Sequence, residues 1–330
     1  MTRVRAIEGL EPEGYQPHAL HAPDRAWVEK NCYIDIWIEV VHALGCEPMA
    51  MMPFALAIDF EGDQWTFFKP SHDELYELYG IDVQELNPWL SLLQHAETYL
   101  AAGKLVSSEA DAFWLPDTSG TDYRRAHTKT TIVITDLDVE HQRLGYFHNA
   151  GYYALEGEDF VQTFRVGFPD DPTFMPFYVE AIRRDRLVVR PRDELTEMAL
   201  ASLKKQLRRR PVDNPVLRFG RQLPDDLARL HEQGLDTYHR WAFATLRQLG
   251  AAFESVALCL AWIDEGRAGA AFTDARAAFL QLSDQAKVFL LKAARAVNRK
   301  RALDVADDVQ LMADAWQRGM DQLDHRVGGS

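Results

Sequence analysis

A helical repeat of apolar side chains follows Asn31 and is the clearest pattern in the chain. Its positions recur three or four residues apart, as on one face of a buried amphipathic helix. They are Tyr33, Ile36, Trp37, Val40, Val41 and Leu44. Asn31 can cap this helix and Gly45 can end it. Cys32 then lies in the first turn, where free N–H groups and the positive end of the helix dipole favour a thiolate.

The first 190 residues predict helices followed by an antiparallel sheet. Ser71 and Glu74 form a capping box for a helix that runs through Tyr79 to a stop at Gly80. A second helix is predicted over 88–102. Alternating or β-branched runs bounded by turn residues predict strands. These strands are expected over 64–68, 105–115, 128–137, 143–147 and 152–155, with a hairpin made by 177–183 and 186–189. The order predicts an α+β domain over residues 1–190.

After Pro191 the apolar repeat is helical almost to the end of the sequence. Helices are predicted over 194–209, 224–233, 235–264, 270–280, 283–299 and 303–323, with Ser283 as an N-cap. The long apolar stripe in 235–264 is typical of a helix in a protein core. Residues 191–330 are therefore predicted to form an all-α helical bundle domain.

Charge and cysteine content narrow the classes of protein that fit. The formal net charge of −14 argues against non-specific nucleic-acid binding. Two basic runs, 204–210 and 287–301, could dock an acidic partner or simply be solvated helix faces. The sequence shows no long apolar span and no signal peptide, so neither membrane insertion nor secretion is expected. Three widely spaced cysteines suit a reducing cytoplasm, where we expect the protein to be.

A reactive cysteine needs a base, and the base needs a partner that orients it. His127 precedes a predicted strand, and Asn149 follows the next strand after a short connection. Antiparallel pairing could bring the two together at one edge of the sheet. We therefore predict a Cys32–His127–Asn149 triad, with His148 as the alternative to Asn149. The Cys32 backbone N–H would help to hold the oxyanion, with the Asn31 side chain as a second candidate donor.

Other polar residues near this constellation are candidates for binding. We expect Asp111, Asp117, Tyr123 and His148 to contact the amino group or the acceptor of a substrate, although Asp117 and Thr118 would also suit a turn. A metal site made from these carboxylates and histidines is a rival, but the metal-ligand spacings of zinc enzymes are missing from the sequence. No phosphate-binding glycine loop is found either, so we expect no metal and no bound cofactor.

Several motifs resemble the N-terminal domain of the butirosin-biosynthesis acyltransferase family. They are Asn31-Cys32 at the helix start, Gly103 to Val106, Asp111 to Pro116, and His127 with a polar residue 22 positions later. The third catalytic position is Asp in that family and Asn149 here. The chain is more similar to an uncharacterised bacterial family with Leu115-Pro116-Asp117-Thr118 and Tyr146 to Tyr153 motifs. Members of this second family are encoded beside stand-alone amino acid:carrier-protein ligases.

The resemblance covers about residues 25–325 and implies a papain-like cysteine acyltransferase. Such an enzyme takes an aminoacyl group from a carrier-protein thioester, through an acyl-Cys32 intermediate, to an acceptor that the sequence does not identify. Phosphopantetheine would enter only as part of the substrate. The implied partners are a small acidic carrier protein and an amino acid:carrier-protein ligase. Two alternatives remain, a non-catalytic binder of the aminoacylated carrier protein and a cysteine hydrolase such as an amidase, peptidase or thioesterase.

Overall fold

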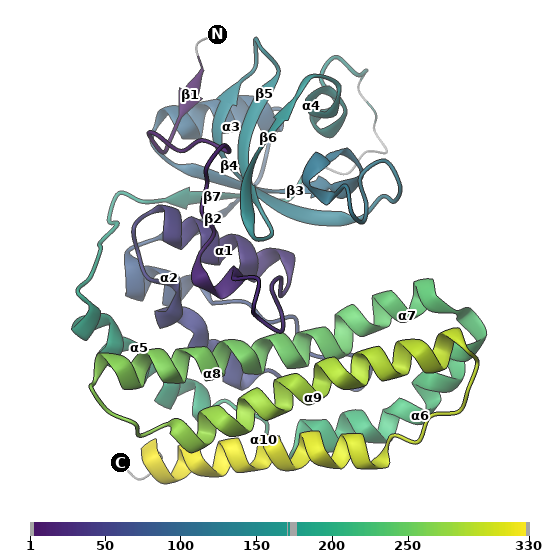
Figure 1. Cartoon of the computed structure of the whole chain (residues 1–330). Coiled ribbons are helices and arrows are strands. Elements are labelled where there is room, and N and C mark those ends of the chain that lie inside the picture. The colour runs from purple at the N-terminus through teal and green to yellow at the C-terminus, as the bar shows by residue number, and fades with distance from the viewer. Residues whose placement is uncertain (1–2, 170, 172–176, 328–330) are drawn as a thin grey trace. The chain divides into compact units, whose positions relative to one another are not determined.

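The computed structural model describes residues 3–169, 171 and 177–327, and divides into two compact units (Figure 1). Unit 1 contains residues 1–22, 31–47 and 72–189, and unit 2 contains 23–30, 48–71 and 190–330. The architecture is therefore α+β, with an N-terminal antiparallel sheet unit followed by a helical unit. Two short N-terminal segments, 23–30 and 48–71, belong to the helical unit, which no local sequence pattern indicates.

Unit 1 is built on one antiparallel sheet, whose strands within the described residues follow the order β2-β7-β3-β4-β5-β6, with β1 paired to β4. The strands are β1 (Val4–Arg5), β2 (Asp82–Leu86), β3 (Leu105–Asp111), β4 (Lys129–Asp138), β5 (Arg143–His148), β6 (Gly151–Glu156) and β7 (Val179–Arg183). Helices α1 (Cys32–Ala43), α2 (His72–Tyr79), α3 (Leu92–Ala101) and α4 (Gly157–Phe164) pack on this sheet (Figure 1).

Helix α1 forms where the apolar repeat predicts it. The Asn31 side chain accepts hydrogen bonds from the amides of Tyr33 and Ile34, and Gly45 takes a positive φ of 76° just after the helix end. The helix packs against β4, β5 and β6. Its buried face contains two carboxylates as well as apolar side chains, because Asp35 and Glu39 are both fully buried beside His21.

Unit 2 is a group of packed helices preceded by one 3-10 segment. That segment is η2 (Pro48–Ala57), which packs on α5 and α8. The helices are α5 (Arg192–Leu207), α6 (Pro215–Gln233), α7 (Leu235–Ala242), α8 (Gln248–Gly266), α9 (Thr273–Asn298) and α10 (Ala306–Val327), with a π-helical turn, Phe243–Arg247, between α7 and α8. Helix α9 lies between α8 and α10, and α10 also contacts α6 (Figure 1).

Two predicted features differ from the observed structure, and one observed strand has no counterpart among the predicted elements. Residues 64–68 form no strand, and only an isolated bridge joins Trp65 to Phe60. The predicted hairpin of 177–183 and 186–189 is wrong, because β7 pairs with β2 and β3 instead. Strand β2 was not predicted. Its sequence, Asp82-Val83-Gln84-Glu85-Leu86, is mostly polar because it is the outer strand of the sheet.

Ser283 lies inside a helix and does not start one. The two helices predicted over 270–280 and 283–299 are a single helix, α9. The Ser283 hydroxyl is fully buried and accepts a hydrogen bond from the Trp27 indole at 2.9 Å. Because the Ser283 hydroxyl accepts from a side chain distant in sequence, the preference of serine for N-cap positions is overridden here.

Among the described residues, one helical stretch is long and apolar enough to cross a membrane. It is Leu235–Gly266, and 83% of its most apolar window is buried inside the structure. Such burial is typical of a core helix in a helical bundle.

Candidate active site

Cys32 is the first residue of α1 and is partly exposed. Its thiol lies close enough to the Thr130 hydroxyl and the Thr131 backbone, both near the start of β4, for them to affect its pKa. The N-terminal cap uses the amides of Tyr33 and Ile34 and leaves out the amide of Cys32 itself. The nucleophile candidate therefore sits between a helix start with a free N–H and the first residues of a strand.

Burial raises the pKa of the Cys32 thiol above its ordinary value. The Thr130 hydroxyl opposes this effect through a hydrogen bond, the nearby Asp35 charge adds to the increase, and the Thr131 backbone again lowers the pKa. The helix position favours a thiolate, but the loss of solvation is the largest effect on this thiol and the pKa is raised overall. A buried thiol of this kind reacts only if a neighbouring group takes its proton.

A chain of hydrogen bonds connects the Cys32 side of Thr130 to a buried histidine. The Thr130 hydroxyl lies 2.7 Å from His148 Nε2, and His148 Nδ1 lies 2.5 Å from Asp117 Oδ2. The side chains of His148 and Asp117 are only 2% and 3% exposed. The other Asp117 oxygen accepts a hydrogen bond from the Tyr146 hydroxyl at 2.5 Å. One hydroxyl group therefore separates the thiol from a His–Asp pair.

Local sequence explains how these groups meet. Tyr146 and His148 are two residues apart on β5, so they point to the same face of the sheet. Asp117 lies on a 3-10 turn, Pro116–Thr118, that the Thr118 hydroxyl fixes by donating to the carbonyls of Ala112 and Leu115. The pairing of β4 with β5 begins at Val133–Phe147, so Thr130 and His148 lie just beyond its end.

Proton positions follow from these contacts. With a carboxylate at Asp117, the contact at His148 Nδ1 needs a hydrogen on that nitrogen, and in this tautomer Nε2 accepts from the Thr130 hydroxyl. Burial, followed by the Asp117 charge, raises the pKa of Tyr146 well above its ordinary value. Tyr146 therefore remains a neutral donor to Asp117. The pair is arranged so that His148 can accept a proton at Nε2 and hold it as an imidazolium.

The structure places the predicted base, His127, away from this chain of contacts. The His127 side chain is 69% exposed, its Nδ1 lies 2.6 Å from Asp111 Oδ2, and its ring stacks on Phe113 with centroids 4.3 Å apart. Within the described part of the chain, no recorded contact joins His127 to Cys32 or to Asn149. The structure thus brings together two of the predicted binding residues, Asp117 and His148, and separately pairs His127 with Asp111.

Asn149 and Tyr123 have local roles that the structure makes visible. Asn149 has a positive φ of 45° and, with Ala150, makes the two-residue turn between β5 and β6. Asparagine is one of the few residues that tolerates this conformation. The Tyr123 hydroxyl donates to Asp159 on α4 at 2.9 Å, and Arg124 also bonds to Asp159. The turn alternative therefore fits the backbone of Asn149.

No metal-binding geometry is found among the residues that the structure describes. No group of three or more His, Cys, Asp or Glu side chains there is arranged to hold an ion. The carboxylates and histidines named above are instead paired with one another, as Asp117 with His148 and Asp111 with His127.

The fold and site together define a two-part α+β protein with a helix-start cysteine beside a buried His–Asp pair. The chain belongs to the DUF1839 family. The model of the DUF1839 N-terminal domain matches residues 16–184, and that of the DUF1839 C-terminal domain matches residues 192–325. A search of the curated proteins finds no match.

The pH dependence of Cys32 alkylation should reveal the raised thiol pKa. We expect its rate with iodoacetamide, followed by peptide mass mapping, to have a midpoint above that of a free cysteine, which is about 8.5. Thr130→Val removes a hydrogen bond that lowers the pKa, so the midpoint should rise further. Thr130→Ser keeps the hydroxyl and is the matched control. A midpoint below that of free cysteine would contradict the assignment.

Proposed function

We propose that this protein is a cysteine acyltransferase in which Cys32 carries the acyl group. The observation that carries the proposal is the contact chain from the Cys32 thiol through Thr130 to the buried His148–Asp117 pair. Activated nucleophiles of acyl transfer combine a nucleophile, a base and an orienting carboxylate, and here the Thr130 hydroxyl links the first two. A helix-start cysteine followed by an antiparallel sheet also suits a papain-like arrangement, as the resemblance of the motifs implies.

The proton moves through Thr130 in this mechanism. The thiol gives its proton to the Thr130 oxygen while the Thr130 hydroxyl proton passes to His148 Nε2, so threonine is unchanged and an imidazolium forms beside Asp117. The Cys32 thiolate attacks the carbonyl carbon of a thioester. The developing oxyanion accepts a hydrogen bond from the Cys32 amide, which the Asn31 cap leaves available. The leaving thiolate takes the proton back from His148, and an acyl-Cys32 thioester remains.

An acceptor amine completes the reaction. It attacks the acyl-Cys32 carbonyl and loses a proton to His148 as the carbon–sulfur bond of Cys32 breaks. An amide product leaves, and the Cys32 thiolate is protonated again by way of Thr130. If water attacks in place of the amine, the same groups perform hydrolysis, which is why the acyl-enzyme step is the one to test first. The donor that the resemblance implies is an aminoacyl group on the phosphopantetheine arm of a small acidic carrier protein.

The test is to look for the acyl adduct by intact mass. The protein is incubated with aminoacyl thioesters of N-acetylcysteamine and with aminoacylated carrier protein, and the modified residue is mapped. We expect one aminoacyl group on Cys32 and none on Cys32→Ser, while Cys46 and Cys259, which are both buried, serve as internal controls. The proposal fails if no adduct forms and the thioesters are consumed no faster than by Cys32→Ser.

A further inference from the structure

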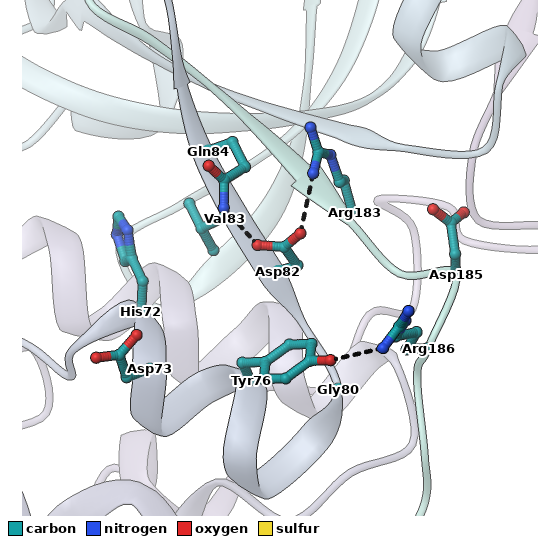
Figure 2. A pocket seen from close by; sticks show the side chains of 10 residues that line it. All are labelled: His72, Asp73, Tyr76, Gly80, Asp82, Val83, Gln84, Arg183, Asp185 and Arg186. Carbon is teal, nitrogen blue, oxygen red and sulfur yellow. Dashed lines mark hydrogen bonds and ion pairs between the residues drawn. The ribbon is translucent and has the colours of Figure 1, made fainter.

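A cavity of about 480 Å³ lies at the outer edge of the sheet in unit 1, beside β2 and α2 (Figure 2). Its wall comes from the start of α2, from β2, and from the end of β7 with the residues that follow. The volume is in the range of small-molecule sites. None of the residues in the predicted triad lines this cavity, so its function is considered separately from the chemistry of Cys32.

Charged groups of both signs line this cavity. Three carboxylates, Asp73, Asp82 and Asp185, face two guanidinium groups, Arg183 and Arg186. Asp82 is already partly engaged, since it accepts from Gln84 at 2.6 Å and pairs with Arg183 at 3.1 Å. In Figure 2, the Asp82 carboxylate lies between His72 and Arg183.

Arg186 differs from Arg183 in that its side chain contacts a neutral hydroxyl and not a carboxylate. Its Nη1 donates to the Tyr76 hydroxyl at 3.0 Å (Figure 2). Within the described residues, no carboxylate lies within ion-pair distance of this guanidinium. A guanidinium has five N–H donors in a planar fork that matches a carboxylate. Arg186 therefore offers several donors to a ligand in the cavity.

The backbone that carries Arg186 is held close to α2. Gly80 ends α2 with a positive φ of 69°, and a Cβ at this position would lie only 1.9 Å from the Arg186 carbonyl oxygen. The next contact along the chain is the Val188 amide, which donates to the Tyr79 carbonyl at 2.9 Å. The glycine thus permits a close approach that places the Arg186 side chain beside Tyr76 and Asp82 on a well-supported segment.

We propose that this cavity binds a small zwitterion, such as a free amino acid, with its carboxylate on Arg186 and its ammonium group on Asp82. A purely anionic ligand would have three carboxylates as neighbours, and a purely cationic one would meet two guanidinium groups. A ligand with one charge of each sign is attracted by both sets. The hydrogen bond from Gln84, with the Arg183 contact, lowers the pKa of Asp82, which keeps this carboxylate ionised.

One wall of the cavity touches the segment that carries Cys32. His72 Nε2 lies 3.1 Å from the Tyr33 hydroxyl and 3.5 Å from the buried carboxylate of Glu180. Tyr33 is the residue after Cys32 in α1. The binding proposal nevertheless stands on the cavity alone and holds whether or not Cys32 carries an acyl group.

Calorimetric titration of the full chain tests the proposal. The probes are the twenty amino acids, β-alanine and 4-aminobutyrate, followed by the deaminated and decarboxylated analogues of the best ligand. We expect saturable binding of at least one zwitterion and at least roughly tenfold weaker binding of each single-charge analogue. Cys32→Ser should bind as the wild type does, which separates this result from the acyltransferase proposal.

Variants of Arg186 decide whether the site is the one described. Arg186→Met should weaken binding roughly tenfold or more, and Arg186→Lys should weaken it less because the charge remains. Arg221→Met, at an exposed arginine of unit 2, is the matched control and should bind normally. Circular dichroism checks that each variant is folded. The proposal is overturned if no zwitterion binds at a ligand concentration of about 10 mM, roughly the weakest dissociation constant that we would count as a site. It is also overturned if single-charge analogues bind as tightly as the zwitterion, or if Arg186→Met binds the ligand as the wild type does.

Discussion

Replacing His148 with alanine is expected to lower the rate of Cys32 acylation roughly 100- to 10,000-fold, the range typical of a lost general base. The Cys32 thiol has a pKa raised by burial, so few molecules hold a thiolate without a base. His148 is the imidazole that the Thr130 hydroxyl links to this thiol. The measurement is the single-turnover rate of adduct formation with an aminoacyl N-acetylcysteamine thioester, followed by intact mass.

His127→Ala is the matched control for that experiment. His127 also pairs with an aspartate, but its side chain is 69% exposed and it stacks on Phe113. We expect the His127 variant to keep a rate close to that of the wild type. Asp117→Asn should slow the reaction too, because the orienting charge behind His148 is lost. A large loss in His127→Ala with normal activity in His148→Ala would favour the triad predicted from the sequence.

Removing the imidazole of His21 is expected to cost about 3–5 kcal/mol in the free energy of unfolding, the range for breaking a buried ion pair. His21 bridges Asp35, 2.9 Å from its Nε2, and Glu39 at its Nδ1, and all three side chains are fully buried. Glu39 also accepts from the Tyr15 hydroxyl at 2.5 Å. In His21→Ala, two carboxylates on the buried face of α1 lose the imidazole that bridges them. Denaturant unfolding and hydrogen exchange of the α1 amides measure the loss.

His141→Ala provides the comparison for this stability measurement. His141 pairs with Asp138 at 2.8 Å, but its side chain is 75% exposed. A pair whose histidine is this exposed contributes little to the free energy of unfolding. Adding Asp35→Asn and Glu39→Gln to His21→Ala should recover part of the stability, because the uncompensated charges disappear. Equal effects of His21→Ala and His141→Ala would show that the buried cluster does not hold α1 in place.

Elements with strong local signals could be predicted from the sequence. Helix α1 combines an apolar repeat with an Asn31 cap and a Gly45 stop, and it starts within one residue of the predicted position. Helix α2 ends at Tyr79 before Gly80, as predicted. The central strands β3, β4, β5 and β6 follow the runs rich in β-branched and aromatic residues. In these cases the apolar repeat, the capping residues and the turn residues all favour the same element.

Elements defined by distant partners could not be predicted. Strand β2 has a polar sequence and exists because it pairs with β7, about a hundred residues later. Ser283 resembles a cap, but its hydroxyl bonds to Trp27 from the other end of the chain. Short apolar runs such as 64–68 give no information about whether a neighbouring strand is present. Local propensity is overridden wherever a long-range contact decides the outcome.

The candidate site likewise contains residues that the sequence identified and contacts that only the structure shows. The sequence by itself determined the position of Cys32 at the start of α1, and it marked Asp117 and His148 within two motifs. It predicted His127 as the base and offered His148 only as an alternative to Asn149, because both histidines stand at ends of β-rich segments. Only the tertiary structure brought Asp117 beneath β5 and placed Thr130 between the thiol and His148. Periodicity specifies which face a side chain occupies, whereas the register of strands far apart in sequence decides which side chains meet.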